Sequence, residues 1–86
     1  MPERRMISAA QIRAGRALLE WTRQQLADAS DTSHSTIADY EKGRNQSMLT
    51  ETARKIIAAF AKAGVEFTGA DKHHGAGVRW KAGQND

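Results

Sequence analysis

The sequence predicts a mainly α-helical domain: a compact bundle of about four short helices that ends in a short C-terminal β-hairpin or strand pair. Three observations support this class. Apolar residues recur at helical spacing up to residue 63, hydroxyl and glycine residues stand where helices begin and end, and apolar and polar residues alternate in 65–68 and 78–81. We expect a helical domain over 1–64, a β-strand extension over 65–82 and a disordered tail over 83–86.

Length and composition limit the class of protein. The 86 residues suit one small domain, and 13 Lys and Arg against 10 Asp and Glu give a net charge of +3, which weakly favours a polyanionic partner. The absence of cysteine excludes a disulfide scaffold and a thiol nucleophile. No apolar run approaches the ~18 residues of a membrane span. Residues 1–20 lack the apolar stretch of a secretory signal, so we expect a cytoplasmic protein without membrane contact.

The first helix is expected to begin after Ser8, its N-cap. Ile12, Gly15 and Leu19 follow at i, i+3 and i+7 and form a narrow stripe for burial. A glycine inside a helix costs about 0.5–1 kcal/mol relative to alanine. We therefore interpret Gly15 as a point of close approach by another helix.

A second helix is expected directly behind the first. Thr22 and Gln25 form a Thr-x-x-Gln capping box, and Trp21 and Leu26 stand at the positions of a hydrophobic staple. The polar cluster at 30–33 predicts a turn after a short helix.

The third helix is predicted over about residues 33–42, with Ser33 as its cap and Gly43 as its stop. Its apolar residues are few, so packing must stabilise it. The fourth helix is expected to start at Ser47 or Thr50 and to end at Ala63 before Gly64. Its core face recurs at helical spacing and comprises Leu49, Ala53, Ile56, Ile57 and Phe60.

Residues 22–43 read TRQQLADASDTSHSTIADYEKG, and this segment resembles the helix-turn-helix of the phage-repressor (Cro/CI, XRE-like) family. The matching features are the Gln-Gln-Leu-Ala run, the Ser-x-x-x-Ile start of the third helix and its Glu-x-Gly end. The resemblance covers about residues 7–63 and implies a lambda-repressor-like bundle that binds double-stranded DNA. Asp31 stands where the family usually has a left-handed glycine, and Ser30 where it has a small apolar residue.

The resemblance implies that the third helix is the recognition helix in the major groove. His34 suits guanine, Ser35 suits donors or acceptors, Ala38 suits a thymine methyl and Asp39 suits the amino group of cytosine. Ser33 completes this base-reading set. A solvated helix face is the alternative interpretation of the same residues.

Other residues flank that helix or fix its orientation. In the family, an arginine of the first helix often pairs with the glutamate that closes the recognition helix. The resemblance therefore implies a structural clamp between Arg16 and Glu41. The alternative interpretation is a weak surface ion pair. The residues that suit phosphate contacts are Arg23, Gln24, Lys42, Arg44 and Asn45.

The C-terminal strands predict a homodimer. Val65, Phe67, Val78 and Trp80 would share one apolar face, and an isolated two-stranded hairpin has marginal stability in water. We expect this face to form the dimer interface, which would place two recognition helices on a near-palindromic operator. Alternatively, the hairpin caps its own domain and the chain is monomeric.

The expected function is therefore a sequence-specific double-stranded DNA-binding transcriptional regulator that represses transcription by occupying a promoter. The alternative is a helix-turn-helix-derived protein-interaction module such as an antitoxin or antiactivator, which the net charge of −1 over residues 21–46 favours. No catalytic set stands in a supporting context, so we expect no enzyme and no cofactor. His73 and His74 lack a third ligand at suitable spacing, so we expect no metal site, and no small-molecule ligand is evident.

Overall fold

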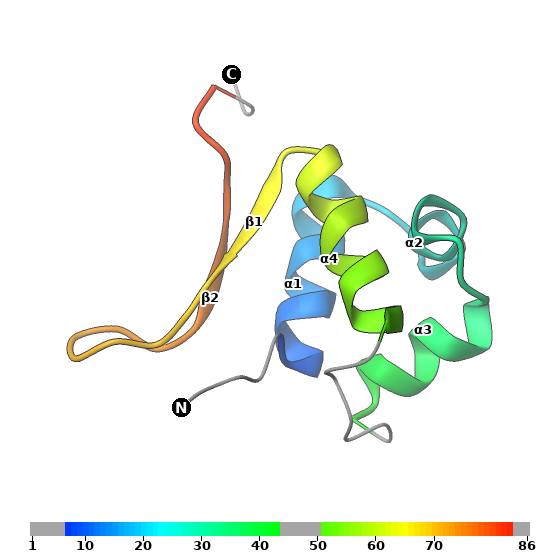
Figure 1. The fold of residues 1–86 in the computed structure, drawn as a ribbon, viewed down its shortest axis with the longest axis horizontal. Coiled ribbons are helices and arrows are strands. Elements are labelled where there is room, and N and C mark those ends of the chain that lie inside the picture. Colours follow the sequence, from blue (N-terminus) through cyan, green and yellow to red (C-terminus); the bar gives the residue numbers. More distant parts are fainter. Residues whose placement is uncertain (1–6, 44–50, 84–86) are drawn as a thin grey trace.

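The computed structural model describes residues 7–43 and 51–83 and confirms the predicted fold class (Figure 1). Four helices precede one antiparallel strand pair. The elements are α1 (Ala9–Leu19), α2 (Arg23–Ser30), α3 (His34–Glu41), α4 (Glu51–Lys62), β1 (Val65–Thr68) and β2 (Gly77–Trp80). The predicted start of the fourth helix at Ser47 or Thr50, the predicted core residue Leu49 and the tail residues 84–86 lie outside the described residues.

The helix starts follow the predicted caps. Ser8 Oγ accepts from the backbone N–H of Gln11 at 3.1 Å, and Thr22 Oγ1 accepts from that of Gln25 at 3.0 Å. Both glutamine side chains accept in return from the cap backbone, so α1 and α2 each begin with a complete capping box. Ser33 caps α3 in the same way but without the reciprocal contact. These bonds satisfy N–H groups that no helical carbonyl reaches.

Two helices end on left-handed residues that are not glycine. Asp31 closes α2 with φ 58°, the left-handed conformation that the family resemblance implied at this position. Glu20 closes α1 with φ 58°, and the following Trp21 N–H donates to the Arg16 carbonyl at 3.0 Å. The sequence carries no signal for the second case, because glutamate is not a preferred residue in this conformation.

The core centres on the ring of Phe60 in α4, which is fully buried. The rings of Trp21 and Phe67 lie on it, with centroids at 5.9 Å and 5.2 Å. Gly15 of α1 faces the same ring: a Cβ at this position would lie 3.0 Å from Phe60. The predicted close approach of another helix at Gly15 is therefore confirmed. Leu19, predicted in the same stripe, is only half-buried because α1 ends there.

We expect Gly15→Leu to lower the free energy of unfolding by about 1–3 kcal/mol, the usual range for overpacking. The Phe60 ring cannot move aside easily, because Trp21 and Phe67 hold it. Ala17→Leu is the matched control, since Ala17 lies exposed on the same helix and its replacement should change stability by less than about 0.5 kcal/mol. Urea denaturation followed by circular dichroism measures both; equal stabilities would contradict the close approach.

The strand pair continues the core of the bundle. Its register pairs Val65 with Trp80 and Phe67 with Val78, so these four side chains share one face, as predicted. That face packs on the helices: Val65 is 1% exposed, and the other three are half-buried against the core.

The second strand differs slightly from the prediction of 78–81, because it begins at Gly77, which pairs with Thr68. Gln11 of α1 contacts both strands at this end of the hairpin. Its buried side chain donates to the carbonyls of Thr68 and Gly77 at 3.3 Å and 2.8 Å. At the other end, Lys81 N–H donates to the Gly64 carbonyl at 2.8 Å and extends the ladder beyond the strand.

The hairpin and α3 lie on opposite sides of the bundle, with α1 and α4 between them (Figure 1). α4 packs against β1, and α1 packs against both strands and against α3. The surface of α3 therefore stays clear of the hairpin. Among residues 7–43 and 51–83, no helix is long and apolar enough to cross a membrane.

Candidate nucleic-acid interface

The helix α3 has one buried side and one exposed side. Ile37, Tyr40 and Glu41 are buried against the bundle. The predicted base-reading residues lie on the other side. Four of them, His34, Ser35, Ala38 and Asp39, belong to the helix, and Ser33 is its N-cap. Ala38 is half-buried and the other four are exposed. The hydroxyl of Ser33 already caps the helix, which leaves its lone pairs partly occupied.

The predicted phosphate-contacting residues separate into three groups. Gln24 and Lys42 are exposed, although the Gln24 amide donates to Asp28 at 2.9 Å. Arg23 is turned toward the buried Glu41 rather than wholly toward solvent. Arg44 and Asn45 lie outside the described residues.

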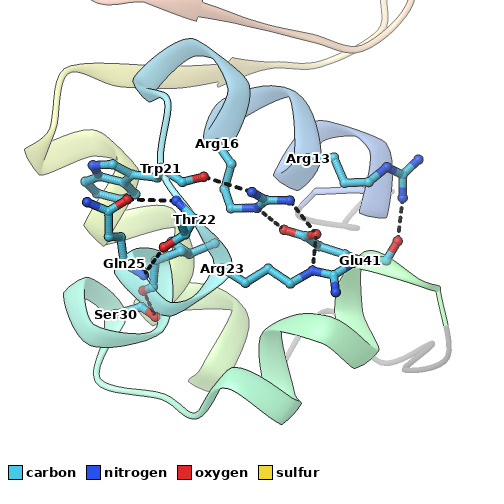
Figure 2. A network of polar contacts seen from close by, with 9 residues as sticks. Arg13, Arg16, Trp21, Thr22, Arg23, Gln25, Ser30 and Glu41 are labelled. Atoms are coloured by element: carbon cyan, nitrogen blue, oxygen red, sulfur yellow. Dashed lines mark hydrogen bonds and ion pairs between the residues drawn. The ribbon is translucent and has the colours of Figure 1, made fainter.

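The side chain of Glu41 is the centre of a polar network that joins α1, α2 and α3 (Figure 2). Its carboxylate has no exposed surface. Arg16 donates to both carboxylate oxygens, from Nε at 2.6 Å and from the terminal nitrogen Nη2 at 3.0 Å, and also to the Trp21 carbonyl at 2.8 Å. The structure thus brings the predicted pair Arg16 and Glu41 into a two-bond contact inside the protein, which suits a planar guanidinium.

Two further arginines belong to this network, and the sequence did not predict them there. Arg23 Nε donates to Glu41 Oε1 at 3.0 Å, and Arg13 donates to the backbone carbonyl of Glu41. Figure 2 shows both side chains converging on the same residue. A helical spacing of three between Arg13 and Arg16 puts both on one side of α1, and that spacing is the only signal in the sequence that points to Arg13.

The arginines determine the ionisation of Glu41. Burial by itself raises the pKa of this carboxyl, but the hydrogen bonds and charges of Arg16 and Arg23 outweigh burial. The pKa of Glu41 therefore lies below its ordinary value, and the residue is ionised at neutral pH. The same hydrogen bond raises the pKa of Arg16.

The buried Ser30 shows how the chain accommodates a polar residue in the turn. Its hydroxyl donates to the Leu26 carbonyl at 2.7 Å and contacts the Thr32 hydroxyl at 2.9 Å. The departure from a small apolar residue is therefore compensated locally, because the buried hydroxyl is hydrogen-bonded.

The histidine pair lies in the exposed loop of the hairpin. Asp71 accepts from the backbone N–H groups of His73 and His74 at 2.8 Å and 2.7 Å, and these bonds, with the His74 side chain, lower the pKa of Asp71. In the part of the chain that the structure describes, no three His, Cys, Asp or Glu residues form a group that could hold a metal. The loop has the features of an Asx turn.

The fold and the exposed polar side of α3 define a helix-turn-helix DNA-binding domain. A family model described as helix-turn-helix matches residues 12–67, a range that runs from α1 into β1. The chain therefore belongs to the XRE-type helix-turn-helix family, which consists of DNA-binding regulators. A search of curated proteins found no match to the chain.

Proposed function

We propose that this protein is a sequence-specific double-stranded DNA-binding regulator that represses transcription by occupying a promoter. The observation that supports this most is α3, whose buried side is fixed in the bundle while its polar side is exposed. A helix held in this way enters the major groove as a rigid body. The family assignment gives the general activity, and the side chains on α3 give the proposed specificity.

Each exposed residue of α3 has a base that it suits. His34 donates to guanine, Asp39 accepts from the amino group of cytosine, and Ser35 suits either kind of group. Ala38 offers a methyl contact to thymine. Phosphate contacts fall to the flanking residues, with Lys42 at the end of α3 and Gln24 near the start of α2; Arg44 and Asn45 belong to the same proposal.

The experiment that tests this proposal is selection of randomised duplexes by the full chain. We expect His34→Ala and Asp39→Ala to change the preferred bases and to weaken binding to the selected site by about 1–3 kcal/mol. His73→Ala is the matched control, because His73 is also exposed but lies in the hairpin loop on the far side of the bundle. Unchanged preference and affinity in both α3 variants would refute the assignment.

A protein-interaction module is the second candidate, and one observation favours it. In the described part of α2 and α3, Asp28, Asp31 and Asp39 are exposed, whereas Arg23 is paired with Glu41. The salt dependence of binding to a random duplex separates the two candidates. A DNA-binding surface gives affinity that falls steeply with salt, and a protein-binding surface gives flat or absent DNA binding.

The proposal includes a homodimer in the cytoplasm without enzymatic activity or a small-molecule ligand. Two copies joined through the hairpin face of Val65, Phe67, Val78 and Trp80 would carry two recognition helices and read a near-palindromic site. Because Val65 is already covered by the bundle, the three half-buried residues provide the surface that is left for a partner. Sedimentation of the full chain at tens of micromolar tests this part, and a monomer there would exclude it.

A further inference from the structure

The hydrogen-bond pattern of the hairpin identifies which groups of β2 point outward. Lys81 donates to the carbonyl of its opposite residue Gly64, so these two form a hydrogen-bonded pair. In an antiparallel ladder such pairs alternate with pairs that are not hydrogen-bonded. Arg79 and Gly77 therefore direct their backbone groups toward β1, whereas Val78 and Trp80 direct theirs away from it.

These outward groups lie on an edge without a neighbouring strand. Among residues 7–43 and 51–83, the backbone hydrogen bonds outside the helices and the strand pair do not involve Val78 or Trp80. α4 packs against β1, α1 packs against both strands, and the described sheet contains only the two strands. At the end of the strand pair near the bundle, Val65 on β1 is buried while its partner Trp80 on β2 is half-buried, and the partners Phe67 and Val78 are both half-buried.

We propose that the outer edge of β2 pairs antiparallel with β2 of a second copy, forming a four-stranded sheet across a two-fold axis at Arg79. This inference deepens the proposed homodimer and rests on it. In this arrangement Val78 lies opposite the partner copy's Trp80, and the reverse, so the outward N–H and C=O groups of both residues exchange hydrogen bonds. The half-exposed Val78 and Trp80 side chains also meet on the same face, where a small residue packs beside a large one.

Other registers use the edge less well. A shift of one residue is excluded, because it would place apolar side chains of one copy on the outer face of the other. A shift of two residues in one direction puts Lys81 opposite Arg79 of the second copy, and Lys81 has no ion-pair partner among the described residues to compensate its charge, whereas Arg79 is paired with Glu66. In the other direction it puts Trp80 opposite Ala76, which lies outside the strand.

The charges on the outer face allow the chosen register. It places Arg79 directly opposite its own copy, which alone would be unfavourable. Each Arg79, however, donates to Glu66 on its own β1 at 2.5 Å, so every copy brings a neutralised pair to the axis. A second copy fits this edge, because the register matches its apolar side chains and its outward backbone groups by symmetry, and Glu66 compensates the charge of Arg79 in each copy. The edge also lies away from α3, so pairing leaves that helix accessible.

Single cysteines test the register, because the chain has none of its own. Residues of a pair that is not hydrogen-bonded have Cα atoms about 4.5 Å apart, within the range of a disulfide. The full-length Arg79→Cys variant should therefore form a covalent dimer on mild oxidation at micromolar concentration. Glu66→Cys is the matched control: it removes the same ion pair, yet its two copies would lie about 14 Å apart, three strand spacings of about 4.8 Å.

The expected result is rapid, nearly complete cross-linking of Arg79→Cys and at least tenfold slower cross-linking of Glu66→Cys on a non-reducing gel. Equal rates, or no covalent dimer from Arg79→Cys, would overturn the pairing. Hydrogen exchange on the unmodified chain gives a second readout: the Val78 and Trp80 amides should become protected as concentration rises, while the Arg79 amide stays protected throughout. If sedimentation shows a dimer but the Val78 and Trp80 amides stay unprotected, the β2 pairing is refuted and the proposed homodimer stands. A monomer would refute both the pairing and the homodimer. Neither outcome bears on DNA binding, which is measured separately.

Discussion

Replacing Arg16 with alanine is expected to lower the free energy of unfolding by about 3 kcal/mol, the lower part of the range for breaking a buried ion pair. Arg16 makes two hydrogen bonds to a carboxylate that is wholly enclosed, and a third to the Trp21 carbonyl. Without it, the contact from Arg23 is the one that the described residues still make to the Glu41 carboxylate. The loss is therefore larger than for a surface pair, which contributes about 0–1 kcal/mol.

Two variants separate charge from geometry and from position. Arg16→Lys keeps the charge but cannot make the planar two-bond contact, so its stability should lie between those of the original chain and Arg16→Ala. Arg13→Ala is the control on the same helix, because Arg13 is exposed and reaches only the backbone carbonyl of Glu41. We expect it to change stability by less than about 1 kcal/mol. Urea denaturation of all three at pH 7 is the measurement, and unchanged stability for Arg16→Ala would refute the clamp.

The same network connects stability to the proposed DNA binding. Glu41 is the last residue of α3, and its partners come from α1 and from the start of α2. The orientation of α3 relative to α1 and α2 therefore depends on these contacts, although none of them lies on the exposed side of the helix. Loss of Arg16 should lower the affinity for all DNA sequences by a similar factor. Loss of His34 or Asp39 should instead change which bases the protein prefers.

Much of the fold could be predicted from the sequence because local signals and apolar spacing agree. The capping box at Thr22 marks the start of α2, and Gly43 follows the end of α3, as predicted. Gly15 could be interpreted correctly because a glycine in a helix needs a packing reason. The left-handed Glu20 could not be predicted, because nothing local distinguishes it and only the joining of α1 to α2 requires it.

For the candidate interface, the exposure of the α3 side chains could be predicted from the sequence, whereas the partners of the charged residues could not. Spacing within one helix places His34, Ser35 and Asp39 on the exposed side, so the sequence suffices there. Whether an arginine faces phosphate or a buried carboxylate depends on contacts between helices. The sequence therefore missed that Arg23 contacts Glu41, 18 positions away.

The hairpin shows the same limit. Alternation predicts that four apolar residues share a face, but not what that face covers. Here it covers Phe60 and the end of the bundle, and Gln11 fastens the loop end of both strands. The surface left for a partner is consequently the edge of β2 and the half-exposed Val78 and Trp80, a distinction that only the tertiary structure makes.

Glu41→Gln is expected to lower the free energy of unfolding by about 3 kcal/mol at pH 7, because it leaves Arg16 and Arg23 without their shared counter-charge. The effect should depend on pH. The pKa of Glu41 is lower in the folded chain than in the unfolded chain, where a glutamate has a pKa of about 4.3. Its contribution to stability is thus present above that unfolded value and is lost as pH falls through the folded pKa.

The difference in stability between the original chain and Glu41→Gln should therefore be constant from pH 7 to about pH 5 and should shrink below about pH 4, where unfolded glutamate binds its proton. Thermal unfolding across this range measures it. Glu66→Gln is the matched control: its pair with Arg79 is exposed, so it should lower stability by less than about 1 kcal/mol. A difference for Glu41→Gln that did not change between pH 7 and pH 3 would show that the carboxylate charge is not what holds the end of α3.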